Sequence, residues 1–270
     1  RYPERTGAMI EIYKSSDDLA RQEIDVLVPT MGALHAGHAS LIKIARQKGK
    51  KVLVSIFINP LQFEDKQDLA NYPKSLDSDL RLAEKAGADA VFIPTTEVIY
   101  PGIVTEVSAG KVGELYEGKS RPKHFNGVLT VVKRLFELTT PKMAIFGEKD
   151  FQQLFLIKQM VKELSLPVDV ISAPTIRDEN GLALSSRNIF LDQNQKKYAQ
   201  VIFRALQKSS IEDMNQEILS EPNFRLDYLE VIDENTFHPA DKSTLNKRAI
   251  IAGWINQVRL IDNMTVSAKS

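Results

Sequence analysis

The chain contains the segment Ile24-Asp-Val-Leu-Val-Pro-Thr30, which is followed at once by Met31-Gly-Ala-Leu-His-Ala-Gly-His38. Residues 24–30 are mostly apolar and β-branched, which predicts a strand, and residues 37–47 have the pattern of the helix that follows it. A second strand is predicted at 51–58, because a nearly continuous apolar run is typical of a strand covered on both faces. The first fifth of the chain therefore predicts a strand–helix–strand unit.

The same alternation continues to about residue 173. Further helices are predicted at 75–87, 125–138 and 151–164, and further strands at 88–93, 143–146 and 168–172. Strands that alternate with helices of this length indicate a parallel sheet with helices on both faces. Residues 100–123 carry four glycines and scattered charges, so we expect an excursion or lid there. The predicted fold is α/β, with a Rossmann-like parallel-sheet domain over residues 9–174.

After Pro174 the pattern changes. Helices are predicted at 192–209 and 211–220, and alternating strands at 225–233, 248–256 and 257–262. This order predicts a smaller C-terminal α+β lid domain over residues 175–270. Residues 1–8 hold two arginines, a proline and a glycine but no apolar core, and we expect them to be an appended remnant rather than a signal peptide.

Composition excludes several classes of protein. The 270 residues include no cysteine, which rules out disulfide frameworks, thiolate zinc sites and cysteine nucleophiles. Lysine plus arginine and aspartate plus glutamate are both 35, so the formal net charge is zero, which argues against a nucleic-acid partner. No apolar run approaches the roughly 20 residues that span a membrane. We therefore expect a cytoplasmic protein that binds neither nucleic acid nor membrane.

The first candidate site is the turn at 29–38. His35 and His38 are three residues apart at the start of a helix, so they share a face where free backbone N–H groups attract anions. Gly32 and Gly37 allow a ligand to approach the backbone closely. The alternatives are two histidines that cap a turn, or two metal ligands. A metal is disfavoured because His124 and His238 lie beside no carboxylate cluster.

Two further segments follow strands. Phe146-Gly-Glu-Lys-Asp-Phe-Gln-Gln153 offers a cation at Lys149 and a carboxylate at Asp150 that suits Mg²⁺, although its acidic residues also suit plain helix capping. Asn180-Gly-Leu-Ala-Leu-Ser-Ser-Arg-Asn188 groups hydroxyls and an arginine that bind anions, although polar linkers have similar compositions. Ligands of open α/β sheets bind beyond the carboxyl ends of the strands. We expect these segments to meet there, with the neutral amides of residues 57–62 on the same rim.

Together these segments resemble the pantoate–β-alanine ligase family, within the HxGH nucleotidylyltransferases. The matching stretches are PTMGALHAGH, SIFINPLQF, NYPKSLDSDL, RPKHFNGVLTVVKRLF, FGEKDFQQ, PTIRDENGLALSSRN and RLIDN, in family order through residues 29–263. The resemblance implies ATP-dependent condensation of pantoate with β-alanine through a pantoyl adenylate. Pyrophosphate and then AMP are released. It also implies Mg²⁺ with the ATP and a homodimer.

The resemblance implies a role for each matching position. His38 is expected to be a catalytic proton donor, His35 a second phosphate contact and Lys149 a third catalytic group. The expected ATP contacts are Met31, Gly32, His35, Gly37, His38, Gly147, Lys149, Asp150, Ile176, Leu184, Ser185, Ser186 and Arg187. The expected contacts to pantoate or β-alanine are Gln62, Gln153, Met31, Asn59 and Tyr72. Asp150 is the expected Mg²⁺ contact.

Three other functions fit part of the pattern. Another nucleotidylyltransferase of the superfamily would share the two histidines but would not need Gln62 and Gln153. An aminoacyl-tRNA synthetase would need an anticodon-binding domain and a basic surface. A catalytically silent dinucleotide-binding scaffold would be expected to carry G-x-G-x-x-G after its first strand, and this chain does not.

Overall fold

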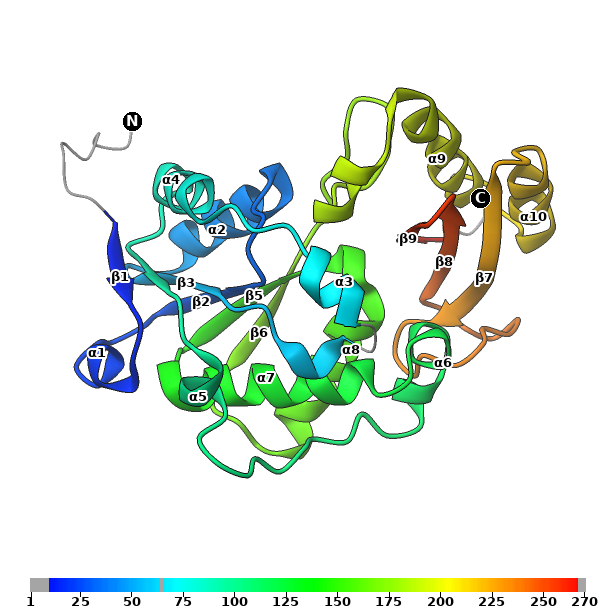
Figure 1. Cartoon of the computed structure of the whole chain (residues 1–270). Coiled ribbons are helices and arrows are strands. Elements are labelled where there is room, and N and C mark those ends of the chain that lie inside the picture. The colour runs from blue at the N-terminus through cyan, green and yellow to red at the C-terminus, as the bar shows by residue number, and fades with distance from the viewer. Residues whose placement is uncertain (1–9, 64–65, 267–270) are drawn as a thin grey trace.

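Two sheets organise the chain in the computed structural model, which describes residues 10–63 and 66–266 (Figure 1). The first sheet is parallel, with strand order β1-β4-β3-β2-β5-β6. Its strands are β1 (Glu11–Tyr13), β2 (Val26–Thr30), β3 (Val52–Ile56), β4 (Ala90–Phe92), β5 (Met143–Gly147) and β6 (Asp169–Ala173). The second sheet is antiparallel and consists of β7 (Phe224–Asp233), β8 (Lys247–Ile255) and β9 (Val258–Thr265).

Helices cover both faces of the parallel sheet (Figure 1). The N-terminal part of the chain holds α1 (Ser16–Leu19), α2 (Ala36–Lys48), α3 (Lys66–Asn71), α4 (Leu76–Ala86), α5 (Thr96–Ile99), α6 (Glu117–Ser120), α7 (His124–Thr139) and α8 (Phe151–Glu163). The C-terminal part holds α9 (Gln193–Leu206) and α10 (Ile211–Leu219). Apolar residues of α2 and α4 pack on one face of the sheet, and those of α7 and α8 pack on the other.

Burial explains why the central strands form. Every residue of β3 is buried, as are four of the five in β2, so these strands lie between the two helical layers. The predicted α/β class is confirmed, and the predicted strands and long helices lie within three residues of the observed ones. The short edge strand β1 was not predicted.

Strand order fixes where a ligand can bind. The chain moves outward from β2 through β3 to β4 and then returns to the other side of β2 with β5. The loops after β2 and β5 therefore leave the sheet in opposite directions and open a crevice at their carboxyl ends. These loops carry the His35–His38 turn and the Lys149–Asp150 turn.

The C-terminal sheet has a hydrophobic core of its own, formed with α9 and α10. Because the two sheets have separate cores, we propose that residues 9–174 and 175–270 are distinct domains. The expected remnant at 1–8 lies outside the described residues. Within the segment 100–123, residues 107–109 lie against α7, where the backbone N–H groups of Val107 and Ala109 donate to the side chains of Thr130 and Asn126.

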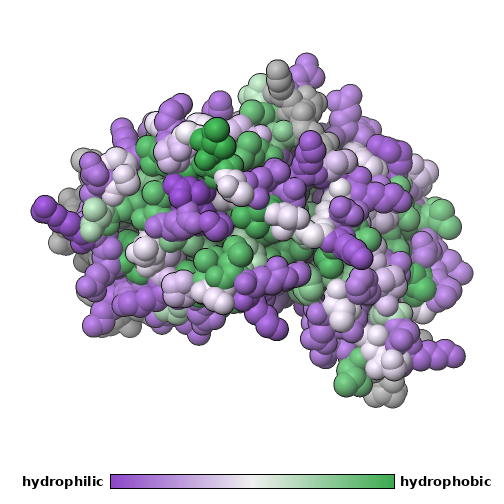
Figure 2. All heavy atoms as spheres, turned by 90° about the horizontal axis from the view of Figure 1, so that it is seen from below, coloured by the Kyte–Doolittle hydropathy of each residue, from purple (hydrophilic) through white to green (hydrophobic). Residues whose placement is uncertain are grey.

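No helix in the described part of the chain is both long and apolar enough to cross a membrane. In Figure 2, hydrophilic residues are spread across the face shown, with apolar side chains interspersed among them.

Candidate active site

The turn after β2 is held by a carboxylate from α4. Asp79 is buried, and its two oxygens accept hydrogen bonds from the backbone N–H groups of Ala33, at 2.9 Å, and Leu34, at 2.8 Å. Gly32 has a φ of +83°, and a Cβ there would lie 3.1 Å from an Asp79 oxygen. A glycine is therefore required at this position for the turn to close over Asp79.

His35 and His38 cap the first turn of α2. Nδ1 of His35 accepts from the Gly37 N–H at 3.1 Å, and Nδ1 of His38 accepts from the His35 N–H at 3.3 Å. An imidazole nitrogen that accepts a hydrogen bond carries no proton, so both neutral rings carry theirs on Nε2. The capping interpretation and the anion-binding interpretation are therefore compatible, because each ring keeps one N–H donor for a ligand.

The environment keeps both rings neutral. Burial and the nearby Lys149 cation lower the pKa of His35 to about 4. Burial, together with the neighbouring His35, lowers the pKa of His38 to about 3. Each ring thus begins as a hydrogen-bond donor rather than a cation, and a phosphate placed against it raises its pKa.

A 3-10 turn after β3, residues Pro60–Gln62, positions Gln62. The turn packs against α7 at Gly127, where a Cβ would lie 2.3 Å from the Leu61 carbonyl oxygen. The side chain of Gln62 is buried, donates to the sulfur of Met31 and accepts from Asn59. Asn59 itself is fully buried and also donates to the Gly127 carbonyl at 2.9 Å. Its position suits holding Gln62 rather than touching a ligand.

The turn after β5 contributes charge. Residues Glu148–Asp150 form a 3-10 turn that leads into α8. The Lys149 ammonium lies 3.6 Å from an Asp150 oxygen. Of the two glutamines that follow, Gln152 is buried and binds backbone groups of residues 112–117, whereas Gln153 lines the cavity.

The third segment folds back on itself after β6. Leu184 N–H donates to the Ile176 carbonyl at 2.9 Å, which brings these two apolar side chains to the same cavity. Ser185 begins the next 3-10 turn, and its hydroxyl accepts from the Arg187 N–H at 3.3 Å. Ser186 reaches across to the Ala33 carbonyl at 3.4 Å. The segment therefore lies against the turn that precedes α2.

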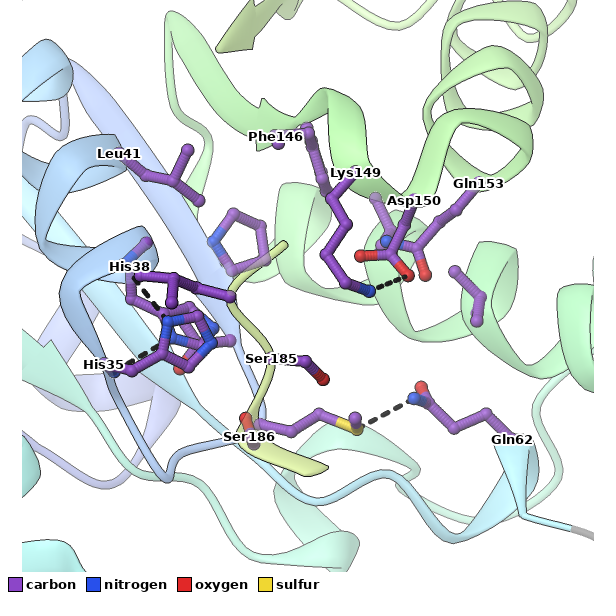
Figure 3. A pocket seen from close by; sticks show the side chains of 18 of the residues that line it. His35, His38, Leu41, Gln62, Phe146, Lys149, Asp150, Gln153, Ser185 and Ser186 are labelled. Atoms are coloured by element: carbon purple, nitrogen blue, oxygen red, sulfur yellow. Dashed lines mark hydrogen bonds and ion pairs between the residues drawn. The ribbon is translucent and has the colours of Figure 1, made fainter. Parts of the chain in front are cut away.

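These segments enclose one cavity of about 260 Å³. In Figure 3, His35 and His38 lie on one side of it, and Lys149, Asp150 and Gln153 enter from the other. The predicted residues that line it are Met31, His35, Gly37, His38, Gln62, Tyr72, Gly147, Lys149, Asp150, Gln153, Ile176, Leu184, Ser185, Ser186 and Arg187. Gly32 and Asn59 lie behind the lining, in the supporting positions described above.

Two further residues that were not predicted to belong to the site, Arg121 and His124, also line the cavity. His124 is buried, its Nδ1 lies 2.9 Å from the Gln62 carbonyl, and its Nε2 lies 3.1 Å from an Arg121 nitrogen. Because arginine only donates, His124 accepts at Nε2 and donates from Nδ1. Burial, with the Arg121 charge beside it, lowers the pKa of His124 to about 3. The neutral ring therefore links Arg121 to the backbone of Gln62.

The lining predicts the kind of ligand. Lysine, arginine, serine and imidazole donors suit a polyanion, and two glutamines suit hydroxyl or carboxylate groups. Among the described residues Asp150 is the only carboxylate that lines the cavity. Residues 10–63 and 66–266 contain no group of three histidine or acidic side chains that would hold a metal by themselves.

The sequence is similar to those of known proteins of one family. A sequence profile described as pantoate-beta-alanine ligase matches residues 6–265. The chain belongs to the pantoate–β-alanine ligase family. It is 44% identical over 261 residues to a pantothenate synthetase of Chlorobium phaeovibrioides, covering 91% of this chain and 89% of that protein. The predicted family, and with it the predicted ligase activity, is confirmed.

Solved structures of this ligase family agree with the fold. The pantothenate synthetase of Thermus thermophilus superimposes with a TM-score of 0.92 at 40% identity, covering 96% of this chain and all of that one. A pantoate-beta-alanine ligase of Francisella tularensis, solved in complex with "beta-gamma ATP" and β-alanine, has a TM-score of 0.83 at 36% identity. That alignment covers 96% of this chain and 99% of the relative.

Proposed function

We propose that the cavity between the turns after β2, β5 and β6 carries out the family reaction, the ATP-dependent joining of pantoate to β-alanine. The observation that supports this most strongly is that one cavity brings together His35, His38, Lys149 and Arg187 with Gln62 and Gln153. The first four suit a triphosphate and the last two suit a hydroxy acid. A reaction between these two ligands needs both sets at one place.

In the first step a carboxylate oxygen of pantoate attacks the α-phosphorus of ATP. The bond from that phosphorus to the bridging oxygen breaks, and pyrophosphate leaves with the electron pair. The Nε2–H groups of His35 and His38 donate to phosphate oxygens as charge moves onto the leaving group, and Lys149 and Arg187 neutralise it. As the phosphate charge raises the pKa of His38, its ring can take up a second proton from solvent at Nδ1, in place of the hydrogen bond from the His35 N–H, and pass its Nε2 proton to the departing pyrophosphate.

In the second step the amine of β-alanine attacks the carbonyl carbon of the adenylate. The carbon–oxygen bond to AMP breaks, AMP leaves, and the amine loses a proton as the amide forms. No protein nucleophile is needed, which agrees with a chain that contains no cysteine. The residues are therefore expected to act by positioning and by stabilising charge.

The cavity also has an apolar wall that fits pantoate. Val128, Val131, Val132 and Leu135 lie along one side of α7 and line the cavity together with Phe57. Pantoate carries two methyl groups on a quaternary carbon, between its hydroxyl groups. We therefore place the dimethyl carbon against α7, with Gln62 and Gln153 holding the polar groups.

Mg²⁺ is expected to arrive bound to ATP rather than to reside in the protein. Magnesium is commonly bound by one or two carboxylates together with substrate phosphates, and Asp150 offers one carboxylate at the cavity. When bound, the ion would neutralise phosphate charge. Asp150 would hold it from the protein side.

The oligomeric state of the protein and its location in the cell stay predictions. We propose that the protein is a homodimer, as the family resemblance implies, and sedimentation equilibrium of the purified protein tests this. The expected cytoplasmic location is tested by fractionating cells that express the chain.

An omission assay tests the proposed function. Purified protein is incubated with Mg·ATP, pantoate and β-alanine, and pantothenate and AMP are measured by mass spectrometry as each substrate is left out in turn. Pyrophosphate release is expected to require pantoate but not β-alanine. A panel of other hydroxy acids provides the specificity control. Equal release with no acid present would contradict the proposal.

A further inference from the structure

The RLIDN stretch on β9 contains two buried polar residues that the reaction does not use, Asp262 and Asn263. Each is 4% exposed. They lie in the C-terminal sheet, yet their side chains contact the two segments that follow β5 and β6 in the other sheet. Buried polar groups are costly unless they are fully paired, so their partners are informative.

Asn263 holds the turn that bears Lys149. Its Nδ2 donates to the carbonyl oxygens of Glu148, at 2.8 Å, and Lys149, at 2.9 Å. Its Oδ1 accepts from Arg248 at 2.6 Å, so every polar atom of the side-chain amide is paired. The residues that precede this 3-10 turn and α8, Gly147 and Asp150, make no capping hydrogen bond with a side chain of their own. Asn263 therefore supplies the side-chain contact to this turn from the other sheet.

Asp262 holds the neighbouring segment in the same way. It accepts hydrogen bonds from both terminal nitrogens of Arg177, one of them at 2.9 Å. Arg177 lies between Ile176 and the fold-back that brings Leu184 to the cavity, and it also donates to the Gly181 carbonyl at 3.0 Å. Consecutive residues of β9 thus contact two segments that line the cavity, Asn263 through backbone carbonyls and Asp262 through the side chain of Arg177.

We propose that Asn263 is a positioning residue for Lys149, which it holds through the Lys149 carbonyl, so that the C-terminal domain sets where the ammonium meets the phosphates. The inference rests on the proposed function, because it assigns Lys149 to phosphate. A displacement of about 1 Å at a reacting group can lower a rate by about 10²-fold, so a backbone contact of this kind is sufficient to matter.

The test variant is Asn263→Asp. Aspartate has the shape of asparagine and keeps the oxygen that accepts from Arg248, with Arg177 also close by. It places a second oxygen against the two carbonyls, which removes both hydrogen bonds to the turn. Asn263→Ser, which is shorter and uncharged, provides a second route to the same loss. Asn235→Asp is the matched control, because Asn235 is exposed in the same domain and gains the same charge.

A double-mutant cycle separates positioning from general structural damage. Pyrophosphate release with pantoate and Mg·ATP is measured for wild type, each Asn263 variant, Lys149→Ala and the double variants, with thermal melting recorded for each. We expect Asn263→Asp to lower kcat by roughly 10- to 100-fold when Lys149 is present, and by less than about threefold when Lys149 is absent. Asn235→Asp should match wild type.

The outcomes are distinct. An equal fold-loss in the two backgrounds, in either Asn263 variant, would overturn the proposal, because a purely structural defect does not depend on Lys149. Unchanged kcat in both Asn263 variants would overturn it as well. If wild type itself releases no pyrophosphate with pantoate, the proposed function fails instead, and that result is read from the wild-type arm alone.

Discussion

The buried His124 makes stability depend on pH in a way that can be calculated. Its pKa is lowered to about 3 by burial and by Arg121, whereas a histidine in an unfolded chain titrates near 6.5. Between these two pKa values, His124 is therefore neutral in the folded state and protonated in the unfolded state. The stabilising contribution is complete at neutral pH and is lost as the pH falls from about 6.5 toward 3.

The size of the effect follows from the two pKa values. At pH 5 the unfolded histidine is almost fully protonated while the folded one is neutral. Between pH 7 and pH 5 the free energy of unfolding should therefore fall by at most about 2 kcal/mol through His124 alone. His124→Gln removes the titrating group, so this variant should lose about 2 kcal/mol less than wild type over the same range.

Urea denaturation at pH 7, 6 and 5 measures this difference directly. His35 and His38 remain in the variant, so their contributions cancel in the comparison. His238→Gln is the matched control, because His238 is exposed and its variant should follow the wild-type curve. If His124→Gln and wild type lose equal stability between pH 7 and pH 5, the neutral buried ring inferred between Arg121 and Gln62 is refuted.

Three substitutions test other parts of the site. His38→Ala should lower the rate of pyrophosphate release by about 10²-fold or more, with the circular dichroism spectrum unchanged. The control His238→Ala, at an exposed histidine, should keep the wild-type rate. A wild-type rate in His38→Ala would remove His38 from the mechanism. Gln62→Ala should raise the KM for pantoate more than the KM for ATP, because Gln62 lines the cavity. Gln207→Ala, at an exposed glutamine, is the control. Equal increases in the two KM values would show that Gln62 is not a specific contact of pantoate. Asp79→Asn leaves one of two loop N–H groups unpaired and should cost about 1–3 kcal/mol in urea unfolding, so unchanged stability would contradict its role.

The main strands were predictable from sequence because a strand that is buried on both faces has a continuous run of apolar residues. Runs such as residues 51–58 are apolar at nearly every position, and no other element of this length needs that pattern. Strand β1 has no such apolar run, because two of its three residues are exposed and it forms only by pairing with β4. A pattern of three residues is too short to separate a strand from a loop.

The site was predictable where local sequence determines the chemistry. The role of the histidine pair can be predicted from its position in the sequence, because residues between the end of a parallel strand and the beginning of the next helix lie at the crevice. Asp79 left no comparable signal, since an aspartate in the first turn of a helix usually faces water. His124 and Asn263 act through partners 62 and 114 residues away along the chain, so only the folded structure reveals their function.

Oxygen-isotope transfer can show whether a pantoyl adenylate forms in this cavity. Pantoate labelled with oxygen-18 in its carboxylate is incubated with the protein, Mg·ATP and β-alanine, and the products are analysed by mass spectrometry. Attack on the α-phosphorus followed by carbon–oxygen cleavage predicts one labelled oxygen in AMP and none in pyrophosphate. Label found in inorganic phosphate or pyrophosphate instead, with none in AMP, would contradict the account.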